Sequence, residues 1–134
     1  MSLLNAAKTG NIEVVGQHIH AGTDPNRTFT FVVKGGDAGG ASPLHLAVAY
    51  DHENIVWLLL DNGANINIRA TNLDGASPLA WAAFWGKVRM TKILLDWGAD
   101  VDALDNHRNN AIESLEASPF VDEATKTKLF SMMK

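Results

Sequence analysis

Histidine side chains are frequent metal ligands, and two of the five histidines in this chain, His18 and His20, lie close together. Residues two positions apart on a helix point in different directions, so these two imidazoles do not face a common ion. No carboxylate lies at ligand spacing from them, and the chain has no cysteine. We therefore predict no metal site.

Nucleophilic serines and phosphate-binding loops also leave recognisable patterns. Ser42 and Ser77 each precede a proline and lack the glycines of a nucleophile elbow. The glycine cluster GGDAGG at 35–40 lacks the Lys-Ser or Lys-Thr pair of a phosphate-binding loop. We predict that the protein is not an enzyme and uses no cofactor. The alternative is an enzyme whose site is formed by an insertion at 27–40, with Lys34 and Asp37 placed in a cleft.

The aromatic residues indicate binding more strongly than any titratable group does. All four tryptophans and the single tyrosine lie between residues 50 and 97. Exposed tryptophan and tyrosine contribute a large part of the binding energy at interfaces, and truncation at a hot spot costs about 2 kcal/mol or more. Their exposure depends on the elements that hold them.

An internal repeat indicates those elements. Residues 41–67, ASPLHLAVAYDHENIVWLLLDNGANIN, recur thirty-five positions later at 76–102 as ASPLAWAAFWGKVRMTKILLDWGADVD. In each copy a Ser-Pro pair starts a helix, apolar residues recur at helical spacing, and a second helix ends at Gly63 or Gly98. A helix pair of this length cannot bury its own apolar face, so the copies must stack as a solenoid.

The same template extends toward both ends of the chain. Backwards, Gly10 takes the place of Gly86, and forwards, Ala111 takes the place of Pro78. The final segment is helical in pattern from Val121 onward, but its register has slipped. We predict one domain over 1–134, with units at about 2–26, 41–69, 76–104 and 105–134. The end units look like polar caps.

The Ser-Pro-Leu-His box at 42–45 and the close Leu-Leu-Asp-Trp-Gly-Ala-Asp-Val-Asp at 94–102 resemble the ankyrin repeat. The resemblance covers about residues 2–118, with serine at 42 and 77 and alanine at 80 as departures from the usual wording. It implies an all-α solenoid of helix-turn-helix units with β-hairpin connectors. It also implies that His45 is structural, and that a partner meets the hairpin tips and the exposed side of the first helices.

On that template we expect the partner-binding residues at the exposed ends of the first helices and at the hairpin tips. They are Tyr50, Trp81, Phe84, Trp85 and Trp97, with Arg69, Leu73, Asp74, Leu104 and His107 along the tips. For Trp81 and Trp97 taken singly, we favour filling of gaps between units. We expect Phe84 and Trp85 together to be exposed, and Trp57 to pack against a neighbouring helix from the outer face.

The first connector is longer than the template allows. Residues 27–40, RTFTFVVKGGDAGG, fill a space that the template gives to six residues. Their β-prone run and glycine-rich return indicate a lengthened β-finger. Two interpretations stay open, a binding loop and a surface insertion in which Phe29 and Phe31 cover the core of the first unit.

Charge and hydropathy exclude two classes of partner. The net charge is −4, and neither half of the chain is basic enough to bind a phosphate backbone, so we predict no nucleic acid. The longest strongly apolar stretches, 55–60 and 78–85, are too short to span a bilayer, and the start does not resemble a signal peptide. We predict no membrane contact and expect a cytoplasmic protein.

We therefore predict a non-catalytic protein–protein interaction module, monomeric when unbound, that binds a peptide or folded partner through a concave groove and its hairpin tips. One alternative is a methyl-lysine reader, because WAAF at 81–84 resembles part of the ankyrin domain of certain histone methyltransferases and rings attract cations. The positions that would complete that cage, Ala41, Leu46 and Ala49, supply neither ring nor acid. The other alternative is a pure scaffold or a fragment of a larger repeat array.

Overall fold

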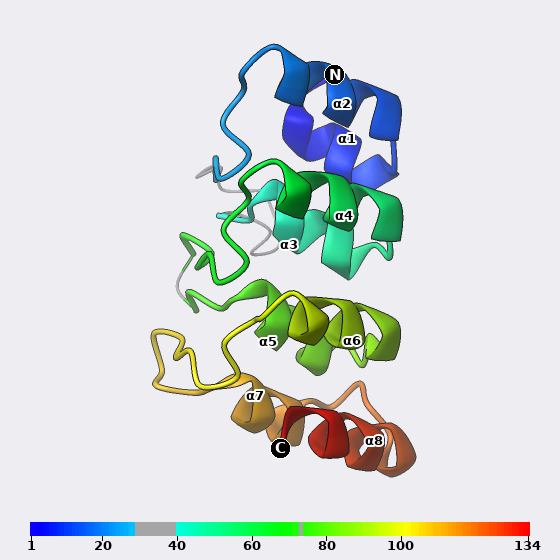
Figure 1. Ribbon diagram of the computed structural model, residues 1–134. Helices are drawn as coiled ribbons and strands as arrows, with labels where there is room; N and C mark the ends of the chain where they lie inside the picture. The colour runs from blue at the N-terminus through cyan, green and yellow to red at the C-terminus, as the bar shows by residue number, and fades with distance from the viewer. Residues whose placement is uncertain (29–39, 73) are drawn as a thin grey trace.

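The computed structural model describes residues 1–28, 40–72 and 74–134, and these residues form eight helices in four stacked pairs (Figure 1). The helices are α1 Leu3–Thr9, α2 Ile12–His20, α3 Pro43–Ala49, α4 Glu53–Asp61, α5 Pro78–Phe84, α6 Val88–Asp96, α7 Ala111–Ala117 and α8 Glu123–Met133. Helices α1, α3, α5 and α7 pack on one another as an inner layer, and α2, α4, α6 and α8 form the outer layer. The all-α solenoid is confirmed. Most of the expected finger, residues 29–39, and Leu73 lie outside the described residues.

The first helices of the last three units begin where the sequence predicts. The side chains of Ser42, Ser77 and Asn110 each accept a hydrogen bond from the backbone N–H three residues later. In α3 and α5 a proline follows the cap, where a missing N–H costs nothing. These caps start α3, α5 and α7 at equivalent points of their units.

The connectors differ from the expected β-hairpins. Among the residues that the structure describes there is no strand, and the connectors are turns. Backbone hydrogen bonds close them, from Ala70 N to Ala76 O at 3.0 Å and from Asp105 N to Asn109 O at 2.9 Å. Side-chain bonds from asparagine and aspartate replace the rest of a strand ladder, because these residues bond readily to nearby backbone groups.

The register slip expected near the C-terminus is confined to one helix. Helix α7 starts 33 residues after α5, but α8 starts 35 residues after α6, as α6 does after α4. The fully buried side chains of Leu59, Leu94 and Leu129 keep this spacing on the outer layer. The connector between α6 and α7 is two residues shorter than the connector between α4 and α5. The turn between α7 and α8 is two residues longer than the turn between α5 and α6, which restores the spacing. Asp122 caps α8, so the helix begins after Val121 and not at it.

Asp51 occupies a backbone conformation that glycine adopts in the equivalent turns. Its φ is 62°, and the corresponding Gly10 and Gly86 have φ values of 83° and 69°. Its carboxylate also forms an ion pair with Lys87 at 2.5 Å, in an exposed setting where such pairs contribute little. The turn therefore stores backbone strain that a glycine would remove.

We expect Asp51→Gly to be more stable than Asp51→Ala by about 1 kcal/mol, because both lack the carboxylate and only alanine keeps a Cβ in the left-handed region. Urea denaturation of the two variants, side by side, measures the difference. Equal midpoints for the two proteins would show that this turn relaxes without strain.

Candidate functional site

A groove of about 670 Å³ lies on the inner layer of the last three units. Its floor is formed by the first helices, one wall by the connectors and the other by the helix-to-helix turns. The connectors project from one side of the stack, and these turns lie at the opposite side (Figure 1). The floor consists of Leu46, Ala49, Ala80, Trp81, Phe84, Ser114 and Ala117; the connector wall of Asn72, Asp74, Ala76, Asp105, His107 and Asn109; and the turn wall of Tyr50, Trp85 and Lys87.

Six of the residues predicted from the sequence come together in this groove, and the others do not. Those in the groove are Tyr50, Asp74, Trp81, Phe84, Trp85 and His107, and those elsewhere among the described residues are Arg69, Trp97 and Leu104. Leu73 lies outside the described residues. The sequence interpretation missed Lys87 and most of the connector wall.

The turn wall carries exposed aromatic rings. Tyr50 is 50% exposed and Trp85 is 46% exposed, and both directly follow the first helix of their unit. Phe120, 63% exposed, stacks on Trp85 with 4.9 Å between ring centroids and an interplanar angle of 22°. Phe84 meets both rings edge-on, at 5.3 Å and 5.6 Å between centroids. These three rings hold one another in place.

Phe120 reaches Trp85 because the turn between α7 and α8 is anchored to the preceding unit. The buried Ser118 donates its hydroxyl hydrogen to the carbonyl oxygen of Phe84 at 2.5 Å. The sequence interpretation missed Phe120, although it lies 35 residues after Trp85, as Trp85 lies 35 after Tyr50. That spacing was the available signal.

The tryptophans divide between the groove and the outer layer. On the floor, Trp81 is partly buried and packs on the His45 ring with 4.7 Å between centroids. On the outer layer, Trp57 meets Trp97 edge-on at 6.1 Å, directly after α6. Trp57 thus packs at the end of the neighbouring outer helix, as expected, and Trp97 is not among the residues that line the groove.

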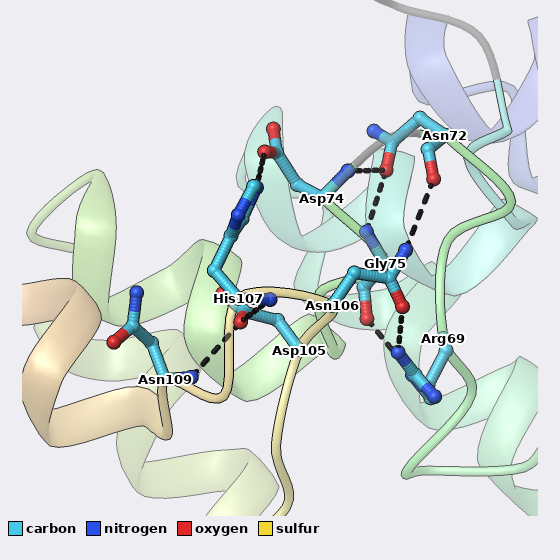
Figure 2. A network of polar contacts seen from close by, with 8 residues as sticks. All are labelled: Arg69, Asn72, Asp74, Gly75, Asp105, Asn106, His107 and Asn109. Carbon is cyan, nitrogen blue, oxygen red and sulfur yellow. Dashed lines mark hydrogen bonds and ion pairs between the residues drawn. The ribbon is translucent and has the colours of Figure 1, made fainter.

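The connectors of the second and third units are joined by a polar network (Figure 2). The Asn72 side-chain oxygen accepts from the backbone N–H groups of Asp74 and Gly75, at 3.1 Å and 2.8 Å. Asp74 O then accepts from Asn106 N across the connectors at 2.8 Å. Arg69 donates to the Gly75 carbonyl at 3.1 Å and to the Asn106 side chain. Arg69 therefore has a structural role between connectors.

Two carboxylates of this network line the groove. The Asp74 carboxylate contacts His107 Nε2 at 2.9 Å, an ion pair when the imidazole is protonated (Figure 2). The Asp105 carboxylate accepts from the backbone N–H groups of His107 and Asn109, at 2.8 Å and 2.9 Å. On the opposite wall the ammonium of Lys87 is paired with Asp51. The connector wall is thus acidic, and the turn wall is mainly aromatic.

Within residues 1–28, 40–72 and 74–134, no three histidine, aspartate or glutamate side chains come together as a metal site would need. None of the helices described is long and apolar enough to cross a membrane. Most of the predicted binding residues line the groove.

Stacked helix pairs with a groove along the inner layer define a helical-repeat protein of the solenoid class. The family model described as ankyrin repeats, three copies, matches residues 3–105, and the chain belongs to the ankyrin repeat family. A segment of 64 residues, 48% of the chain, is 36% identical to an ankyrin repeat-containing protein of Schizosaccharomyces pombe. The match covers 27% of that protein's own length.

Proposed function

We propose that this chain is a non-catalytic binding module that holds a peptide, or an extended segment of a folded partner, in the groove between its two walls. Ankyrin repeats are generally protein–protein interaction modules. Within that general role, the groove here has an apolar floor, a polar acidic wall and an aromatic wall. A concave apolar surface with a few fixed polar groups is the usual form of a binding site.

The exposed rings of the turn wall are the observation that carries this proposal. The repeat fold places Tyr50 and Trp85 where their burial is not needed for stacking, and each leaves about half of its surface in water. Large rings with an apolar body and a polar group are favoured at interfaces, because they bury much area with little loss of rotamer freedom. A partner that covers them gains that burial.

The alternative functions have less support from the residues described. Of the insertion that would form an enzyme site, only Arg27, Thr28 and Gly40 are described. For the methyl-lysine alternative, Leu46 and Ala49 line the groove beside Trp81 and add neither ring nor acid to a cage. A pure scaffold would not require exposed rings in its groove.

The proposal is tested by selecting peptides from a random library on the purified protein and measuring their dissociation constants by fluorescence anisotropy. We expect the double variant Tyr50→Ala, Trp85→Ala to bind the selected peptides at least about thirtyfold more weakly, since two ring truncations remove about 2 kcal/mol or more.

The matched control is Trp57→Ala, Trp97→Ala, which removes two rings of similar exposure from the outer layer. Circular dichroism and urea midpoints verify that both variants are folded. We expect the control to bind within about threefold of the unmodified protein. Peptides that bind the groove variant as tightly as the unmodified protein would rule out the groove as the site.

A further inference from the structure

Charge is distributed unevenly between the two walls of the groove. The connector wall presents two carboxylates, Asp74 from the connector after the second unit and Asp105 from the connector after the third. Among the described residues that line the groove, Lys87 on the turn wall supplies the only ammonium. That ammonium is already paired with Asp51 at 2.5 Å, and Asp51 lies outside the groove lining. The carboxylates of the connector wall are therefore not balanced from across the groove.

One histidine holds both carboxylates in place (Figure 2). The backbone N–H of His107 donates to Asp105 Oδ1 at 2.8 Å, and His107 Nε2 lies 2.9 Å from Asp74 Oδ1. Asp105 Oδ1 also accepts from the backbone N–H of Asn109 at 2.9 Å. In the part of the chain that the structure describes, no hydrogen bond reaches the Oδ2 atom of Asp74 or Asp105. Each carboxylate is thus positioned through one oxygen and can accept from a partner with the other.

The cationic side chains nearest in sequence to these carboxylates do not line the groove. Arg69 donates to the Gly75 carbonyl and the Asn106 side chain within the connectors, and Arg108 follows His107. Neither arginine is among the lining residues. The Lys8 ammonium lies 5.6 Å from the centroid of the Tyr50 ring, which belongs to the turn wall. A cationic side chain of a partner therefore finds its acceptors at the connector wall and not at the Tyr50 end of the turn wall.

We infer that the occupant of the groove is a basic segment of a partner protein, with an arginine side chain bound by Asp74 and Asp105. A planar guanidinium has five N–H donors and can bond to two carboxylates at once, which the compact ammonium of lysine does less well. Ala80 and Trp81, in the first turn of α5, line the floor directly after the connector and can receive the apolar stem of that arginine. This inference rests on the proposed function and names the class of segment for the same groove.

The opposite wall favours a different kind of side chain. Tyr50 and Trp85 are about half exposed there, and Phe84 meets Trp85 edge-on with 5.3 Å between ring centroids. Such rings gain most from covering apolar groups. Charge complementarity fixes the orientation of a bound segment more than its affinity. The segment therefore presents arginine to the connector wall and apolar side chains to the turn wall.

The test uses the peptides selected from the random library. We expect them to be enriched in arginine. Each arginine is then replaced in turn by citrulline, which has nearly the same shape and no charge. Replacement of the arginine bound at the connector wall should weaken binding about tenfold, and lysine at the same position should weaken it about threefold, as measured by fluorescence anisotropy.

The double variant Asp74→Asn, Asp105→Asn tests the wall from the side of the protein. Asparagine keeps the Oδ1 acceptor that each carboxylate uses within the connectors, and it removes the charge. We expect this variant to bind the arginine peptide about tenfold more weakly than the unmodified protein does. It should bind the arginine and citrulline peptides equally, because one member of the charge pair is already missing. The dependence of its binding on salt should also fall.

The matched control is Asp61→Asn, Asp100→Asn, which changes the net charge by the same amount. Both residues are exposed and lie outside the groove lining. Asp100 matches Asp105 closely, because its Oδ1 also accepts from the backbone N–H two residues later. We expect the control to bind within about threefold of the unmodified protein and to keep the preference for arginine over citrulline. Circular dichroism and urea midpoints verify that both variants are folded.

The outcomes separate this inference from the proposed function. Selected peptides that require Tyr50 and Trp85 but lack arginine, or that bind equally well with citrulline, would overturn the inference and leave the groove as the site. Equal losses in the two asparagine double variants would also overturn it, because net charge alone would then explain the attraction. Failure to select any peptide, or binding that is indifferent to the rings and to the carboxylates, would overturn the proposed function as well.

Discussion

Replacing His45 with glutamine should remove about 3 kcal/mol of acid sensitivity from the stability of this protein between pH 6.5 and pH 4. The His45 side chain is completely buried. Its Nε2 lies 2.8 Å from the carbonyl oxygen of Ala76 in the next unit, and its Nδ1 lies within hydrogen-bond distance of Ser42. Because a carbonyl only accepts, Nε2 carries the hydrogen and Nδ1 accepts from the Ser42 backbone N–H. The neutral ring is the form that fits.

Burial lowers the pKa of His45 from 6.5 to about 4, against the smaller opposite effect of the hydrogen bond to Ala76. Between these two values the unfolded chain binds a proton that the folded chain does not. Stability is therefore present in full above pH 6.5 and falls as the pH falls toward 4, by about 1.4 kcal/mol per pH unit. A glutamine can donate to Ala76 and accept from Ser42 without titrating.

Urea denaturation at several pH values between 7.5 and 4 gives the free energy of unfolding for both proteins. We expect the two curves to be parallel above pH 6.5 and to converge below it, since only the unmodified protein loses the contribution of the neutral ring. Curves that stay parallel down to pH 4 would contradict the assignment. Alanine occupies the equivalent position in the next unit, Ala80, so the fold itself does not require histidine there.

His45 also shows why the fold could be predicted from the sequence. Its capping role depends on Ser42, three residues away, and the Ser-Pro pairs and helical periodicities are equally local. Neighbouring units repeat the same contacts, so the local signals also give the stacking. The slip near the C-terminus was different, because the compensation in the turn before α8 becomes clear only from the packing of α8 on α6.

The site was less predictable, because its residues meet across units. The template gives the turn positions of Tyr50 and Trp85, and these side chains are indeed exposed. It does not show that Asp74 pairs with His107, 33 residues away, or that Trp97 turns to Trp57 on the outer layer. Such pairs depend on side-chain directions in adjacent units, and no local pattern encodes them.

Removal of buried leucine side chains should produce the other large effect and test the repeat architecture. Leu94 and Leu129 are both completely buried on the outer layer, in the third and fourth units. Truncation of either to alanine should cost about 2–5 kcal/mol, from lost burial and the cavity that remains. The local cost is similar, but the two units have different numbers of neighbours.

In a solenoid each unit contacts only its neighbours, so the consequence depends on position. Leu129→Ala should open α7 and α8 while the first three units stay folded, and Leu94→Ala should weaken the stack on both sides of α6. Hydrogen exchange followed by mass spectrometry distinguishes these results by segment. Uniform loss of protection in both variants would show one cooperative block.

The same experiment bears on binding, because Trp85 of the turn wall stacks on Phe120, which belongs to the fourth unit. Opening of the fourth unit in Leu129→Ala would release Phe120 from its stack on Trp85, while Tyr50 would stay in place. We therefore expect this variant to bind the selected groove peptides more weakly than the unmodified protein, although position 129 is buried outside the groove lining. Stability of the end unit and recognition by the turn wall are thus coupled through the stacked rings of Trp85 and Phe120.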